Sequence, residues 1–148
     1  MFDEQWMQIA IQEAIKAQNE GEVPVGAVLV RNGKLIAQAH NQPLFENDAS
    51  AHAEIQVIRA AGKKTNNYRL NNSTIYVTLE PCIMCMGAIM NARIDKIFFG
   101  AYDVKTGACG SCVNLANSKC FNHKLDIKGG ILEEKCQTIL QKFFQIRR

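Results

Sequence analysis

Apolar positions near the amino end of the chain recur at helical spacing. From Glu4 to Gly21 they fall three and four residues apart, and a glycine ends the pattern, which predicts a helix. The next apolar run, residues 25–39, is interrupted by Asn32-Gly33, the strongest short signal for a two-residue hairpin turn. This part of the sequence therefore predicts a helix followed by two antiparallel strands.

The rest of the chain alternates between strand and helix patterns. A polar loop over residues 41–50 precedes a helix from about His52 to Ala61, which we expect Gly62 to close. The β-branched run STIYVTL, residues 73–79, predicts a buried strand, and Pro81 then opens a helix that continues to about Ala92. After these come a strand at residues 94–100, an irregular region, and a terminal helix at residues 131–148.

This alternation predicts one α/β domain spanning residues 1–148. With 148 residues and 47% apolar composition, the chain is long enough for one core and too short for two. A hairpin followed by strands that alternate with helices favours a three-layer α/β/α sandwich with a mixed, mostly parallel central sheet. Ligands of such sheets bind at the carboxyl ends of strands, and Cys82 and Cys85 directly follow the strand predicted at residues 73–79.

The composition indicates an aqueous, reducing compartment. The segment MFDEQWMQIA lacks the basic and apolar parts of an export signal, and no run of roughly eighteen apolar residues occurs. We therefore expect a soluble cytoplasmic protein with no membrane partner, in which the six cysteines stay reduced. They would then serve as metal ligands, nucleophiles or small core residues.

The charged residues are unevenly distributed. The net charge is +3, but residues 119–148 carry seven Lys and Arg against three Asp and Glu, which leaves the remaining chain slightly acidic. A basic end suits a polyanion such as nucleic acid, although a solvated helix face produces the same bias.

The pair Cys82 and Cys85 fits three kinds of site. It is consistent with a redox dithiol, with half of a four-cysteine structural zinc site, or with two ligands of a catalytic zinc site. Cys109 and Cys112 form a second Cys-x-x-Cys pair. Two such pairs approach the spacing of a zinc ribbon, which favours the four-cysteine structural site. The regular structure predicted between the two pairs argues against it, because a domain with its own core needs no metal to fold.

The catalytic alternative takes its third ligand from the sequence AHAE, which carries His52 and Glu54. His52, Cys82 and Cys85 would leave the fourth position of tetrahedral zinc open for water. Residues two apart on a helix point in different directions, so His52 and Glu54 could not both face one site from the flank of a helix. Side chains of the first turn, however, surround the end of the helix axis and can share a site there. We therefore expect the first turns of two helices to meet at the metal, where their partial positive charge favours thiolates. Glu80, a competing carboxylate, is expected to fix the turn at its strand end.

The sequence HAE, followed after 26 residues by PCIMC, resembles the His-x-Glu and Pro-Cys-x-x-Cys signature of the zinc-dependent cytidine and nucleotide deaminases. The segments EVPVGAVLV, NYRL, YVTLEPCIMC, FGAYDVKTGACGS and FFQIRR are similar to one branch, the bacterial tRNA-specific adenosine deaminases. This resemblance covers nearly the whole chain, and it implies a cytidine-deaminase-like fold and a homodimer.

The resemblance implies hydrolytic deamination of adenosine to inosine at the wobble (first anticodon) position of tRNA, an arginine tRNA, by a zinc-activated water. Matched residue by residue, it implies one Zn²⁺ per subunit on His52, Cys82 and Cys85, with Glu54 as the catalytic proton shuttle. The residues that it implies for substrate binding are Asn41, Val23, Pro43, Leu79 and Asp103 around the pocket, and Phe144, Arg147 and Arg148 on a terminal helix that touches the anticodon stem-loop.

Other interpretations stay open at this point. Asp103 is equally explained as a turn cap, and core packing is the default role of Phe144. The same chemistry on a free base or nucleoside, such as guanine or cytosine, would make the basic terminus irrelevant and the reaction insensitive to salt. A non-enzymatic nucleic-acid-binding protein with a four-cysteine structural zinc is a further alternative. It predicts that Cys109 and Cys112, and not His52, hold the metal.

Overall fold

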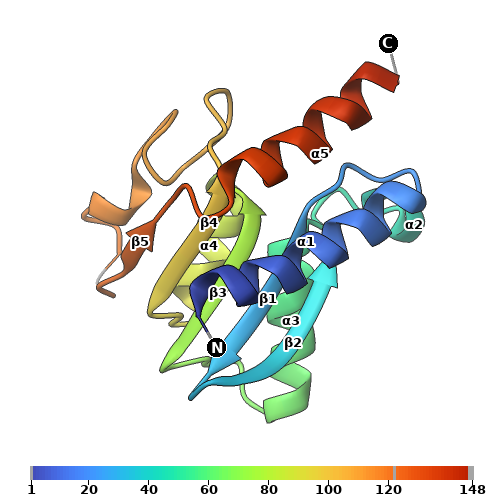
Figure 1. The fold of residues 1–148 in the computed structure, drawn as a ribbon. Coiled ribbons are helices and arrows are strands. Elements are labelled where there is room, and N and C mark those ends of the chain that lie inside the picture. The colour runs from blue at the N-terminus through green and yellow to red at the C-terminus, as the bar shows by residue number, and fades with distance from the viewer. Residues whose placement is uncertain (1, 122, 147–148) are drawn as a thin grey trace.

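The structure is a computed structural model that describes residues 2–121 and 123–146 (Figure 1). The helices are α1 (Asp3–Asn19), α2 (Pro43–Glu46), α3 (Ala53–Thr65), α4 (Ile83–Asn91) and α5 (Glu133–Ile146), with a short 3-10 helix, η1 (Leu115–Asn117). The strands are β1 (Gly26–Arg31), β2 (Lys34–His40), β3 (Ser73–Leu79), β4 (Lys96–Ala101) and β5 (Asp126–Lys128).

The strands form one sheet in the order β2-β1-β3-β4-β5. β1 is antiparallel to both of its neighbours, whereas β3, β4 and β5 pair in parallel. β1 is therefore the reversed strand, and the other four strands of the sheet run in one direction. This agrees with the predicted mixed, mostly parallel sheet.

Helices cover both faces of the sheet, because successive strand residues point to opposite sides. Ala27 and Leu29 of β1 pack with α3 and α4, while Val28 and Val30 of the same strand pack with α1 and the start of α5. Figure 1 shows α1 and α5 in front of the sheet and α3 and α4 behind it. The result is the predicted three-layer α/β/α sandwich.

The structure corrects the sequence predictions at three places. Gly62 does not close its helix, because α3 continues to Thr65 and Asn66 takes the left-handed conformation there, with φ 53°. The predicted polar loop over residues 41–50 contains α2, and the predicted irregular region contains β5. None of the helices in the described part of the chain is long and apolar enough to span a bilayer.

One edge of the sheet gathers the ends of four strands. The carboxyl ends of β2, β3 and β4 lie there because these strands run the same way, and the amino end of β1 lies there because β1 is reversed. The segments that follow or precede these ends therefore meet in space. This edge carries the candidate site.

Candidate active site and metal centre

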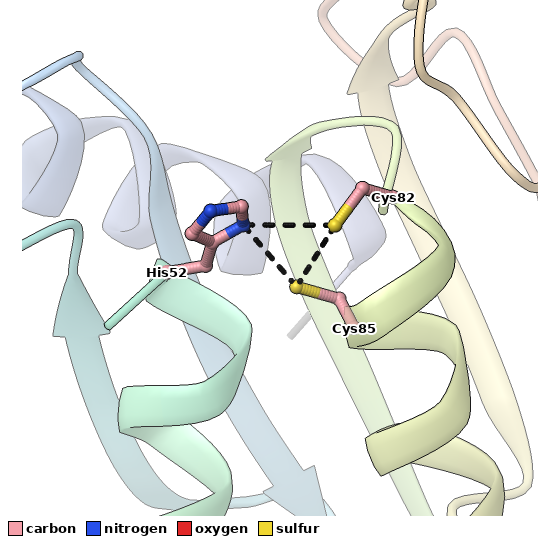
Figure 2. A group of neighbouring side chains, drawn as sticks. All are labelled: His52, Cys82 and Cys85. Atoms are coloured by element: carbon pink, nitrogen blue, oxygen red, sulfur yellow. Dashed lines mark hydrogen bonds between the residues drawn. The ribbon is translucent and has the colours of Figure 1, made fainter. Parts of the chain in front are cut away.

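His52, Cys82 and Cys85 form a compact group at this edge of the sheet (Figure 2). The Nδ1 atom of His52 lies 3.7 Å from Sγ of Cys82 and 3.5 Å from Sγ of Cys85, and the two sulfurs are 3.7 Å apart. Tetrahedral Zn²⁺ with bonds of about 2.0–2.3 Å requires ligand atoms about 3.5–3.8 Å apart. The three side chains thus have the chemistry and the spacing of a zinc site.

The ends of two helices place these ligands. His52 is the N-cap residue of α3, and Cys82 is the N-cap residue of α4, with Cys85 in the first turn of α4. Neither N-cap side chain makes a capping hydrogen bond, so both are available to a metal. Figure 2 shows the side chains pointing toward one another from the two helix ends, as the sequence predicted.

The electrostatics of the group favour a thiolate at Cys82. The hydrogen bond with Cys85, and after it the one with His52, lowers the pKa of the Cys82 thiol to about 4. The hydrogen bond to Cys82 in turn raises the pKa of His52 above its usual value. The same sulfur contact, together with burial, raises the pKa of Cys85, so its proton must leave before it can bind a metal.

Glu54 lies at the second position of α3, beside this group. The residue is only 4% exposed, and burial raises the pKa of its carboxyl group to about 7. A carboxylic acid whose pKa lies near neutrality can both accept and donate a proton under physiological conditions. Glu54 is therefore suited to general acid and base catalysis at this site.

The cavity next to the metal ligands has a volume of about 200 Å³. This is smaller than the roughly 300–1,000 Å³ of pockets for drug-sized ligands, and it suits a single ring. The residues that line the cavity come from these four strand ends and from the start of α3: Val23, Val25, Asn41, His52, Glu54, Leu79, Glu80, Cys82, Asp103 and Thr106.

The structure brings four of the five substrate residues predicted around the pocket to this cavity. Among the proposed contacts, those that line it are Val23, Asn41, Leu79 and Asp103. Pro43 starts α2 and does not line it, and Phe144 is a half-exposed residue near the end of α5. Arg147 and Arg148 lie outside the described residues. Sequence reasoning missed Val25 and Thr106 as lining residues, although each lies within three residues of a predicted contact.

Asn41 is fixed by hydrogen bonds on two sides. Its backbone N–H donates to the carbonyl of Val25 at 3.1 Å, and its side-chain Oδ1 accepts the N–H of Ala53 at 2.7 Å. The side-chain oxygen is therefore occupied by the first turn of α3. The amide N–H₂ group is the part of Asn41 that can bind a ligand in the cavity.

Glu80 supports the opposite side of the cavity. Its buried carboxylate accepts the backbone N–H groups of Asp103 (3.1 Å), Cys109 (2.9 Å) and Ser111 (3.1 Å), and also the Ser111 hydroxyl. This confirms the expected role of Glu80 in fixing the turn.

Asp103 acts as the turn cap that the sequence allowed. Its side chain accepts the backbone N–H groups of Lys105 and Thr106, each at 3.1 Å, and the Thr106 hydroxyl at 2.8 Å. Because Asp103 also lines the cavity, the structural role does not exclude contact with a ligand.

The four-cysteine zinc site is contradicted. Cys109 points its sulfur at the Met86 thioether, 3.3 Å away, and Cys112 is exposed. Within residues 2–121 and 123–146, His52, Cys82 and Cys85 are the one group of three or more side chains with metal-ligand spacing. An α/β sandwich that places this donor set beside a buried carboxylate at its strand ends belongs to the class of zinc-dependent hydrolytic enzymes.

Comparison with known proteins identifies the family. The model of the cytidine and deoxycytidylate deaminase zinc-binding region matches residues 1–101. The chain is 49% identical over 143 residues to the tRNA-specific adenosine deaminase of Bacillus subtilis (strain 168), covering 97% of this chain and 89% of that protein. This chain belongs to the cytidine and deoxycytidylate deaminase family, and its zinc-binding region and His-Cys-Cys group support one Zn²⁺ per subunit.

Solved structures agree with this assignment. A structure from studies of A-to-I editing by tRNA:A34 deaminases at the wobble position of transfer RNA is 43% identical and superposes with a TM-score of 0.90, covering 92% of this chain and 99% of that chain. The guanine deaminase of Bacillus subtilis is 38% identical, with a TM-score of 0.66, covering 69% of this chain and 66% of that chain.

Proposed function

We propose that this protein hydrolyses the adenosine at the wobble position of a tRNA, in particular an arginine tRNA, to inosine. The observation that carries the proposal is that Glu54, His52 and Cys82 line one small cavity, and that His52 and Cys82 form a metal-ligand group with Cys85. The similarity to tRNA-specific adenosine deaminases over nearly the whole chain supports adenosine as the base and tRNA as its carrier.

Zn²⁺, when bound by His52, Cys82 and Cys85, supplies a water molecule whose pKa falls to about 7. Glu54 moves the protons of the reaction. It would accept one proton from the attacking water and place it on N1 of adenine as the water oxygen bonds to C6. It would then take the second proton from the new C6 hydroxyl and give it to the departing amino group. One water is consumed, the C6–N bond breaks, and inosine and ammonia are released.

The other cavity residues hold the base and exclude solvent. The amide N–H₂ of Asn41 is available to an acceptor atom of the nucleoside, while Val23, Val25 and Leu79 provide apolar walls. A base inside a duplex cannot enter so small a cavity, whereas a loop base can be turned outward at low cost. An anticodon loop is a substrate of this kind.

Contacts with the rest of the tRNA are proposed for the end of the chain. Phe144 is 48% exposed and lies against Phe143 in an edge-on arrangement, with the ring centroids 5.4 Å apart. An exposed aromatic ring can stack on a splayed base. Arg147 and Arg148 follow three and four positions later in the sequence and would meet backbone phosphate.

The test is inosine formation on an unmodified arginine tRNA transcript that carries adenosine at the wobble position. Zinc-loaded protein and the Glu54→Gln variant are incubated with this tRNA, and inosine is scored by sequencing. Inosine confined to the wobble position and absent with the variant is the expected result. A zinc-replete, folded protein that forms no inosine would contradict the proposal.

Guanine is the second candidate substrate, because the guanine deaminase of Bacillus subtilis shares the fold and 38% identity with this chain. Ammonia release from free guanine is measured in parallel with the tRNA reaction. A rate on guanine that does not depend on salt, without activity on tRNA, would favour this alternative, since phosphate contacts weaken steeply with salt.

A homodimer and a cytoplasmic location complete the proposal. The similarity to tRNA-specific adenosine deaminases supports the location, and the large anionic RNA on which such enzymes act supports the dimer. A single domain of 148 residues offers limited area for such a substrate, and a second subunit would enlarge it. Sedimentation equilibrium at several protein concentrations measures the mass directly, and a monomer at all of them would contradict the dimer.

A further inference from the structure

Glu22 is a buried carboxylate that the catalytic group does not use. It is only 2% exposed and lies between α1 and β1, one residue before Val23. Its Oε1 accepts the N–H of Leu44 at 3.0 Å, and its Oε2 accepts the N–H of Phe45 at 2.9 Å. In the described part of the chain, Glu22 takes part in no ion pair. A buried carboxylate is costly unless such hydrogen bonds are kept, so its partners should be firmly held.

The two N–H groups belong to the first turn of α2, which depends on Glu22. Pro43 is the first residue of α2 and has no N–H, so Leu44 and Phe45 supply the next two donors. The N-cap residue Gln42 makes no capping hydrogen bond, and α2 buries none of its residues. Leu44 and Phe45 themselves are 67% and 75% exposed. Packing therefore does not hold this four-residue helix, which is too short to be stable alone.

Gln56 of α3 provides the other side-chain support for α2. Its amide donates to Gln42 at 3.1 Å and to Glu46 at 3.0 Å, the latter contact at the surface. Exposed hydrogen bonds compete with water and contribute less than charge-assisted bonds to a buried carboxylate. Glu22 is thus the main side-chain anchor of α2.

The anchored segment continues into one wall of the cavity. The N–H of Asn41 donates to the carbonyl of Val25 at 3.1 Å, and both residues line the cavity. Together with the two bonds to Glu22, this bond joins residues 22–25 to both ends of the segment 41–45. A shift of α2 would therefore be transmitted to Asn41.

We propose that Glu22 is a positioning residue for the deamination, holding the segment of residues 41–45 so that Asn41, at its start, meets the target base correctly. This inference rests on the proposed function, and it assigns Glu22 no contact with substrate. The opposite wall has the same design, because the buried Glu80 holds the turn that carries Asp103. A displacement of about 1 Å at such a wall is enough to lower a rate by up to about a hundredfold.

The test compares Glu22→Gln and Glu22→Ala with a matched control, Glu13→Gln. Glu13 is also a buried carboxylate, at 3% exposure, but it does not line the cavity. Its partners are side chains rather than α2: Lys16, Gln38 and His40. Each protein is loaded with zinc, its metal content and melting temperature are measured, and kcat and KM are determined on an anticodon stem-loop well below all melting temperatures.

The expected result is a loss in kcat with zinc retained. Glu22→Gln keeps one acceptor oxygen, so we expect a decrease of about tenfold, and a larger decrease for Glu22→Ala, with KM changed by less than about threefold. Glu13→Gln should lose stability but keep kcat within about twofold of the wild type. Hydrogen exchange of the Leu44 and Phe45 amides should accelerate in the Glu22 variants and not in the control.

Two results would overturn the proposal. One is a kcat for Glu22→Ala equal to that of Glu13→Gln, and the other is unchanged protection of the Leu44 and Phe45 amides in Glu22→Ala. If the wild-type protein forms no inosine, the proposed function fails instead. Hydrogen exchange of the Leu44 and Phe45 amides in the Glu22 variants then tests the anchoring role of Glu22 without an activity assay. Accelerated exchange supports that role, and unchanged exchange refutes it.

Discussion

Replacing Gly26 with alanine should destabilise the protein strongly. A Cβ atom at Gly26 would collide with the carbonyl oxygen of Ala10 and lie 2.6 Å from the backbone nitrogen of Ala14. Both atoms belong to the backbone of α1, so no side-chain rotation can relieve the contact. α1 would have to move away from β1.

The magnitude follows from what α1 buries. Trp6, Met7, Ala10 and Ile11 pack against the sheet on this face, and separating the two elements would open that core. Overpacking costs about 1–3 kcal/mol when neighbouring groups can adjust. Because the obstacle here is backbone, we expect a loss at the upper end, about 3 kcal/mol. For a chain of this size, that corresponds to a fall in Tm of roughly 6–12 °C.

The matched control is Gly62→Ala, which should change stability in the opposite direction. A Cβ at Gly62 meets only the carbonyl oxygen of Asn67 at 3.5 Å, an ordinary contact, and Gly62 lies inside α3. Alanine is favoured over glycine in a helix by about 1 kcal/mol, which raises Tm by roughly 2–4 °C. Both variants are melted at one fixed zinc concentration, because bound metal itself raises Tm. A Gly26→Ala protein that melts within about 2 °C of the wild type would refute the reasoning.

Three further predictions concern the site and its surroundings. Glu54→Gln should keep one Zn²⁺ per chain and lose about 10²–10⁴-fold in kcat, and a zinc-loaded variant with a normal rate would remove Glu54 from the mechanism. Replacing Cys109 and Cys112 together with serine should leave the zinc content unchanged, whereas loss of the metal would restore the structural-zinc alternative. Although burial opposes its charge, hydrogen bonds led by that to Glu13 raise the pKa of His40. The stabilisation lost in His40→Gln should therefore be full below about pH 6.5 and vanish as pH rises through the raised pKa. Urea denaturation across pH measures this difference, and a difference that grows with pH would contradict it.

Local signals in the sequence predicted most of the fold. The Asn32-Gly33 turn is an example, because both residues have positive φ, 54° and 71°, as a two-residue hairpin turn requires. The strand at residues 73–79 was also placed correctly, since a β-branched apolar run is typical of a buried strand. These elements depend mainly on their own residues and on burial.

The elements that sequence reasoning missed depend on distant partners. α2 is anchored by Glu22, about twenty positions earlier in the chain, and its own residues carry no helical pattern. β5 has three residues with alternating exposure and is the edge strand beside β4 in the described sheet. Gly62 resembles a helix stop, but α3 continues past it to Thr65. Such features cannot be recognised from short-range patterns.

The metal ligands were easier to predict than the cavity walls. His52, Cys82 and Cys85 stand out because few residue types bind zinc. They also fall at the starts of two predicted helices, and the cysteines directly follow a predicted strand, where ligands of such sheets bind. Val25 and Thr106 are ordinary residues whose presence at the cavity follows from the meeting of four strand ends.

The carboxylates around the cavity differ in their hydrogen-bond partners, and this difference separates their roles. Glu80 receives three backbone N–H groups and a hydroxyl, and Glu22 receives two backbone N–H groups. Donors of this kind cannot move without disturbing the loops that they belong to. Burial dominates at Glu54 instead and raises its pKa to about 7. A group that must take up and release a proton in each catalytic cycle cannot also be a fixed acceptor for several backbone donors. Glu54 is therefore suited to carry the proton. Glu22 and Glu80 are suited to hold the segments that carry Asn41 and Asp103 at the cavity.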